Sequence, residues 1–123
     1  MSETRRKVLV VEDDLDQLQI RCMLVAQHGF QAIPAADAPT ALQAAARELP
    51  DCAVVDLQLP TPESGLRLIR ALKELCPKLT VMALTGANLS LLAGHPEMQL
   101  IEHAFTKGTS SRALLEALHG ASA

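Results

Sequence analysis

The sequence lacks tryptophan and tyrosine altogether and contains only two phenylalanines among its 123 residues. Because 49% of the residues are nevertheless hydrophobic, the core must be built from aliphatic side chains. The shortage of rings also disfavours a flavin site, since cofactor pockets are commonly lined by aromatic side chains. A charged fraction of 20% is typical of a globular chain, and the length suits one domain spanning residues 1–123.

A strongly basic surface is also missing, because the formal net charge is −3. This charge disfavours direct nucleic-acid binding, which normally requires a basic face. The chain has no apolar stretch long enough for a membrane span, and its N-terminal residues do not resemble a signal peptide. We therefore expect a cytoplasmic protein without membrane contact.

Metal-binding and disulfide patterns of cysteine are absent. The three cysteines, at positions 22, 52 and 76, are far apart and include no CxxC pair. The four histidines are equally scattered, without the paired spacing of a zinc site. We expect the cysteines to be buried, reduced packing residues, since a free cysteine behaves as a small hydrophobic side chain.

Apolar runs and helical periodicities alternate along the whole chain. Strands are expected at 8–11, 30–36, 52–59, 80–86 and 103–107, and helices at 15–29, 37–49, 65–76, from 89 for two turns, and at 110–119. This regular alternation predicts a doubly wound α/β fold, in which helices cover both faces of a five-stranded parallel sheet. In such folds ligands bind at the carboxyl ends of the strands.

Two helices carry more specific expectations. Asp37 is expected to cap the second helix, which has Pro39 in its first turn and would bury apolar side chains at positions 42, 45, 46 and 49. The helix expected from Leu89 is interrupted by Gly94 and Pro96 and is therefore short.

Polar side chains follow the expected strands at the edge where ligands would bind. They are Glu12 and Asp13 after the first strand, Asp56 after the third, Thr85 after the fourth and Lys107 after the fifth. Neighbouring carboxylates repel one another, and a hard divalent cation such as Mg²⁺ removes that repulsion. An aspartate beside a metal, a hydroxyl and an ammonium group suits phosphoryl transfer.

Each of these residues also has a purely structural explanation. Acids after the first strand could complement the positive end of a helix, and Asp14 in particular is suited to capping it. Asp56 and Thr85 could be turn residues, and Lys107 a solvated charge. These explanations do not account for all of the polar residues falling at strand ends, which favours the phosphoryl site.

Four motifs together resemble the receiver domain of two-component response regulators. They are VLVVEDD, VVDLQLP, LTG and FTK, and each ends a predicted strand. The resemblance covers about residues 7–119. It implies a flavodoxin-like, CheY-like (βα)5 domain with the strand order 2-1-3-4-5.

The resemblance also implies a role for each site residue. Asp56 would accept a phosphoryl group from the phosphohistidine of a sensor histidine kinase or a histidine phosphotransfer protein. Its function as a signalling switch or relay would make it a phosphoprotein and not a conventional enzyme. Mg²⁺, with Mn²⁺ as an alternative, would be held by Glu12, Asp13, Asp56 and the backbone carbonyl of Gln58. Thr85 and Lys107 would contact phosphoryl oxygens, and Gly86 would leave room for the donor.

The sequence departs from the family pattern at three places. Gly65 comes one residue later than usual, so PTPESG is expected to form a longer loop beside Asp56. Gly108 follows Lys107, where proline, which makes a cis bond accessible, is usual. Ala104 occupies a position that is aromatic in many members, so the usual movement of a ring toward the threonine is not available.

An output surface is implied at the fourth helix, fifth strand and fifth helix, where an output partner would bind. Its residues would include those at positions 91, 92, 95, 104 and 112. Three alternatives stay open: a pseudo-receiver that binds proteins without phosphorylation, a flavodoxin-like cofactor binder, and a metal-dependent phosphatase. The acidic segment EDDLDQ disfavours the cofactor binder because it would repel a phosphate.

Overall fold

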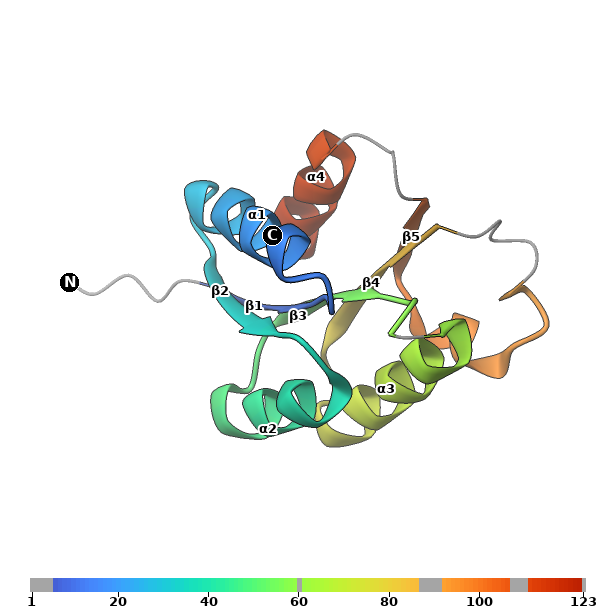
Figure 1. The fold of residues 1–123 in the computed structure, drawn as a ribbon. Coiled ribbons are helices and arrows are strands. Elements are labelled where there is room, and N and C mark those ends of the chain that lie inside the picture. The colour runs from blue at the N-terminus through green and yellow to red at the C-terminus, as the bar shows by residue number, and fades with distance from the viewer. Residues whose placement is uncertain (1–5, 60, 87–91, 107–110, 123) are drawn as a thin grey trace.

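A computed structural model of the chain describes residues 6–59, 61–86, 92–106 and 111–122. Strands and helices alternate as expected (Figure 1). The strands are β1 (Lys7–Val11), β2 (Gln31–Ala35), β3 (Cys52–Asp56), β4 (Thr80–Thr85) and β5 (His103–Thr106). The helices are α1 (Leu15–Gln27), α2 (Ala38–Glu48), α3 (Pro62–Leu75), the 3-10 helix η2 (Pro96–Leu100) and α4 (Ser111–Ser122).

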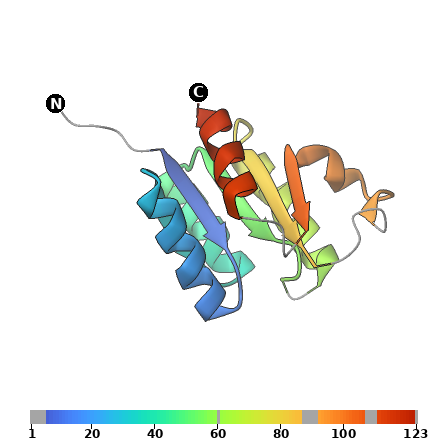
Figure 2. The ribbon, with the colours of Figure 1, turned by 90° about the horizontal axis from the view of Figure 1, so that it is seen from above.

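All five strands form one parallel sheet in the order β2-β1-β3-β4-β5, which confirms the predicted topology. Helices α1 and α4 lie on one face of the sheet, and α2 and α3 lie on the other (Figure 1). Viewed from above, α4 lies over the sheet next to α1 (Figure 2). The strands are therefore covered on both faces, as continuous valine-rich runs require.

Alternate residues of each central strand point into two separate cores. One core joins Leu9, Val11, Ala53 and Val55 of the sheet to α2 and α3. The other core joins the alternate strand residues to α1 and α4. It includes Val8, Val10, Val54 and Met82 from the strands, and Leu18, Val25, Leu115 and Leu118 from the helices. Since side chains alternate between the faces of a strand, each apolar run of five residues supplies both cores at once.

The predicted burial on α2 was partly wrong. Ala41, Ala44 and Ala45 face the core, whereas Ala46 is exposed and Leu49 has 66% of its surface in solvent. For Leu49 the reason lies at the end of the helix, because Leu49 is the C-cap and adopts a left-handed conformation with φ = 50°. Its side chain consequently leaves the apolar stripe that the helical spacing had suggested.

The expected long loop beside Asp56 was also partly wrong. Helix α3 begins at Pro62, three residues before the predicted start, and the Thr61 hydroxyl accepts a hydrogen bond from the Ser64 amide at 3.2 Å. Pro62 stands in the first turn, where its missing N–H costs nothing. The segment from residue 62 to Gly65 is therefore helix and not loop, while residue 60 lies outside the described part of the chain.

The remaining expectations concern the cysteines, the fourth helix and the absence of membrane spans. The three cysteines are free, as expected, but only Cys52 is buried, whereas Cys22 and Cys76 are partly exposed, so the predicted burial is wrong for these two. Burial raises the pKa of the Cys52 thiol to about 11. Residues 87–91, where a fourth helix was expected to start, lie outside the described residues. Among the described helices, none is long and apolar enough to cross a membrane.

Gly65 lies at a position in the described part of the chain where a side chain has no room. A Cβ atom there would lie 2.6 Å from the Leu57 Cα atom, because the first turn of α3 presses on the backbone that follows Asp56. We expect Gly65→Ala to lower the free energy of unfolding by about 1–3 kcal/mol, the usual cost of overpacking. Gly120→Ala is the matched control, since a Cβ there meets nothing within 4 Å. Urea denaturation of both variants tests this, and equal stabilities would contradict it.

Candidate functional site

The carboxyl ends of three adjacent strands bring the predicted polar residues together. In the sheet β3 lies between β1 and β4, with Val11 beside Val55 and Asp56 beside Leu84. The residue after Val11 is Glu12, whose amide donates to the Ala35 carbonyl at 3.0 Å and so continues the path of β1. The strand register thus places Glu12 next to Asp56, with Thr85 following on the other side.

Three carboxylates form the centre of the site. Oxygen atoms of Glu12, Asp13 and Asp56 lie within 4.8 Å of one another. Glu12 and Asp56 are each only 1% exposed, whereas Asp13 is open to solvent. An all-oxygen set of this size fits a hard divalent cation such as Mg²⁺, which completes its coordination with water.

The electrostatics of Glu12 show how crowded the site is. Burial raises the pKa of Glu12 above its ordinary value, and the neighbouring carboxyl of Asp56 raises it further. Two donors act in the opposite direction: the Asp14 amide, at 3.1 Å from Oε2, and the Arg21 guanidinium. The raised pKa of Glu12 reflects the cost of a buried charge beside another carboxyl, a cost that a cation next to the two acids would lower.

Arg21 is a site residue that the sequence analysis missed. Its guanidinium Nη1 forms an ion pair with Glu12 Oε1, and its side chain is only 15% exposed. Arg21 lies in α1 between Leu18 and Val25, two residues that face the core. A cation near the apolar stripe of a helix is the signal that could have drawn attention to it.

The acceptor loop is held by short local contacts. The Gln58 amide donates to Asp56 Oδ1 at 3.0 Å, and the Leu57 amide donates to the Leu84 carbonyl at 2.8 Å. Ligation through the Gln58 carbonyl stays a prediction. Thr85 is fully buried at the end of β4. Lys107 and Gly108 lie outside the described residues, directly after β5 ends at Thr106.

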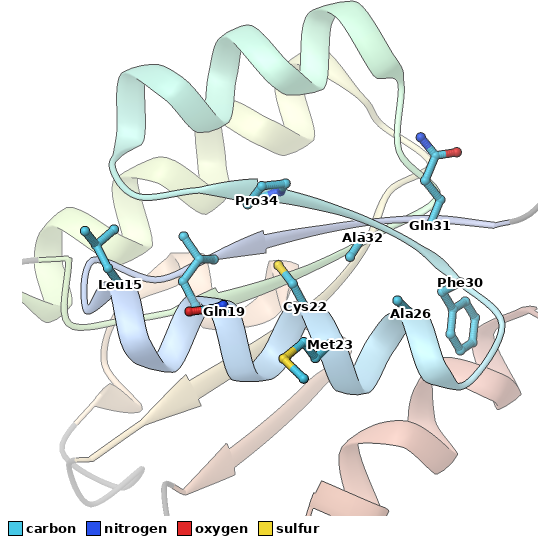
Figure 3. Close-up of a pocket in the computed structure, with 10 residues that line it drawn as sticks. Leu15, Gln19, Cys22, Met23, Ala26, Phe30, Gln31, Ala32 and Pro34 are labelled. Carbon is cyan, nitrogen blue, oxygen red and sulfur yellow. The ribbon is translucent and has the colours of Figure 1, made fainter.

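A groove lies between α1 and β2 (Figure 3). Its lining is apolar apart from two glutamines, with Leu15, Cys22, Met23, Phe30 and Pro34 among its residues. Because no ionisable carboxylate, histidine or basic side chain lines this groove, it offers nothing for phosphoryl chemistry. The acidic cluster is therefore the candidate site.

The comparisons with known proteins agree with this geometry. Residues 8–119 match the response regulator receiver domain. The chain belongs to this family. It is 37% identical over 68 residues to the phosphate regulon transcriptional regulatory protein PhoB of Klebsiella pneumoniae, an alignment that covers 55% of this chain and 29% of that protein. The alignment thus spans less than a third of that relative's length.

Solved structures show the same fold. A CheY-like receiver domain from Methylobacillus flagellatus is 26% identical, with a TM-score of 0.82, and the match covers 96% of this chain and 99% of that one. A response regulator from Burkholderia pseudomallei with a phosphorylated aspartic acid, a calcium ion and citrate is 25% identical, with a TM-score of 0.80. That match covers 92% of this chain and 66% of the Burkholderia chain.

The role of Asp14 as a helix cap, expected from the sequence, is confirmed. Its Oδ1 accepts hydrogen bonds from the amides of Asp16 at 3.0 Å and Gln17 at 3.1 Å. We expect Asp14→Ala to lower the free energy of unfolding by about 1 kcal/mol, since the cap acceptor is lost. Asp14→Asn keeps an acceptor and should cost a few tenths at most. Thermal unfolding of both variants tests this; equal losses would show that the charge matters and not the cap.

Proposed function

We propose that this receiver domain accepts a phosphoryl group on Asp56 in a reaction that depends on Mg²⁺. The observation that carries the proposal is the buried pair of carboxylates, Glu12 and Asp56, with Asp13 at its open side. Burying two acids side by side is costly without a cation, so packing alone gives no reason for them. The Burkholderia neighbour, which carries a phosphorylated aspartic acid and a calcium ion, supports the same chemistry here.

The proposed step is an in-line displacement at phosphorus. A carboxylate oxygen of Asp56 forms the new P–O bond while the bond from phosphorus to the donor's nitrogen or oxygen breaks, and the leaving group keeps that electron pair. Bound Mg²⁺, held by Glu12, Asp13 and Asp56, would neutralise charge on the phosphoryl oxygens. Thr85 would donate its hydroxyl hydrogen to one of these oxygens, and Lys107 would pair with another.

The donor would be a sensor histidine kinase or a histidine phosphotransfer protein, and the chain would take part stoichiometrically, not as a conventional enzyme. The output surface predicted from the sequence needs one correction. Leu92 is only 4% exposed and belongs to the core, so it is not part of a surface. Ala104 and His95 are half-buried and Arg112 is exposed, whereas residue 91 lies outside the described residues.

A pseudo-receiver is the second candidate, and a specific observation favours it. Arg21 already supplies a positive charge to Glu12, so the acids are partly neutralised by the protein itself. In addition, β5 carries Ala104 where many family members have an aromatic residue. Such a module would bind partners in one fixed state, without Mg²⁺ and without a phosphoryl group.

The proposal predicts that acetyl phosphate with Mg²⁺ adds one phosphoryl group to the protein. Intact mass spectrometry would show this gain, and both Asp56→Asn and removal of the metal with EDTA should abolish it. Asp51→Asn is the matched control, because Asp51 is exposed and lies at the opposite end of the same strand. That variant should gain the phosphoryl group like the natural sequence.

A receiver that accepts only from its own kinase would give no mass change with acetyl phosphate. Binding of beryllofluoride, followed by fluorine NMR with Mg²⁺ present, covers that case because it requires the site but no donor. If neither acetyl phosphate nor beryllofluoride modifies or binds the protein, the phosphoryl site is wrong and the pseudo-receiver is correct.

A further inference from the structure

The ion pair between Arg21 and Glu12 differs from the other ion pairs of the described residues. The side chains of Arg21 and Glu12 are 15% and 2% exposed, whereas those of Arg47 and Glu48 are 70% and 30% exposed. No other ion pair within the described ranges has both partners so well covered. An exposed pair is screened by water, but a covered pair acts strongly on nearby charges.

Both carboxylate oxygens of Glu12 have a donor within the protein. Arg21 donates to Oε1, and the Asp14 amide donates to Oε2 at 3.1 Å. The guanidinium therefore sits at the carboxylate that the acidic cluster shares with Asp13 and Asp56. With these three acids ionised, Arg21 reduces the formal charge of the cluster from −3 to −2.

We propose that Arg21 is a resident counter-ion that sets the affinity of the acidic site for its divalent cation. The proposal rests on the metal site put forward above. Arg21 holds Glu12 and neutralises it while the cation is absent. When the cation binds, Arg21 repels it and competes with it for Glu12 Oε1. Arg21 thus stabilises the cation-free protein and lowers the affinity of the site for the cation.

The interaction acts in a known direction because a guanidinium stays protonated at all relevant pH values. A fixed positive charge on an acid that would bind a divalent cation raises the free energy of the cation-bound state. Its loss should favour the cation even though Glu12 loses a hydrogen-bond donor. The three carboxylates would then lack the charge of Arg21, and a bound cation would neutralise more of their repulsion than it does in the natural protein.

The test compares Arg21→Gln with Arg47→Gln by isothermal titration with Mg²⁺ at pH 8. Arg47 lies in the last turn of α2. The next residue, Glu48, pairs with Lys7 at the start of β1, so Arg47 lies at the end of the sheet opposite to the acids. Both variants lose one positive charge. We expect Arg21→Gln to bind Mg²⁺ about tenfold more tightly and Arg47→Gln to stay within about twofold of the natural protein. Arg21→Lys, which keeps the charge, should also stay close to it.

A second measurement uses the natural protein, so it does not depend on how well a variant folds. The Nε–Hε signals of Arg21 and Arg47 are followed by NMR during a titration with Mg²⁺. If Arg21 is the counter-ion of the site, its signal shifts as Mg²⁺ is added, and half of the shift is reached at the Mg²⁺ concentration that gives half-saturation in calorimetry. The signal of Arg47 does not move. A stationary Arg21 signal during saturable binding would overturn the proposal.

The outcomes separate this proposal from the function on which it rests. If all variants bind Mg²⁺ with the same affinity, the metal site stands and Arg21 is only structural. Weaker binding by Arg21→Gln also overturns the proposal, because Arg21 would then hold Glu12 in a binding orientation. If neither the natural protein nor any variant binds Mg²⁺, the metal site itself is wrong.

Discussion

The burial of two carboxylates at the ends of adjacent strands is the constraint on which the rest of this structure depends. Glu12 and Asp56 are each 1% exposed, and the register of β1 against β3 leaves them side by side. Neither acid could be moved toward water without breaking that register, since the strands are covered by helices on both faces. The packing that gives the domain its stability is therefore also what forces like charges together. A charged site of this kind persists because the surrounding fold determines it.

Three features of the surrounding chain reduce that electrostatic cost. The Asp14 amide and the Arg21 guanidinium bind the oxygens of Glu12, and the Gln58 amide binds Asp56 Oδ1. The two backbone donors are positioned by local structure. Asp14 is the cap of α1, and the loop carrying Gln58 turns directly after β3. Gly65 belongs to the same arrangement, because its lack of a side chain lets α3 pack on the backbone of Leu57. Stability and site geometry are thus set by the same few contacts.

Sequence reasoning recovered the parts of the structure that follow from patterns along the chain. Apolar runs ending in acids predicted the parallel sheet and the edge at which the candidate site lies, because the period of a strand and the location of its end are local properties. The start of α3 also has a local sequence signal, the capping residue Thr61 followed by Pro62. The position of Gly65 in the family pattern suggested a loop there instead. Arg21 was missed for a different reason. Its contact with Glu12 depends on how a long side chain reaches across from α1 to the strand end, and no spacing rule specifies that.

The arrangement of β5 bears on how a signal could leave the site. Ala104 pairs with Ala83 in the register of β4 and β5, and Ala83 belongs to the core beneath α2 and α3. Phe105, the next residue, packs instead into the core beneath α1 and α4, and its ring stacks with that of His103 at 6.3 Å. Since side chains alternate across a strand, this ring is directed to the other face of the sheet from Ala104. A ring moving in from position 104 is thus excluded, and Phe105 is on the wrong face to replace it. Among the described elements, β4 connects Asp56 to β5, because Leu84 pairs with Asp56 and four residues of β4 pair with residues of β5.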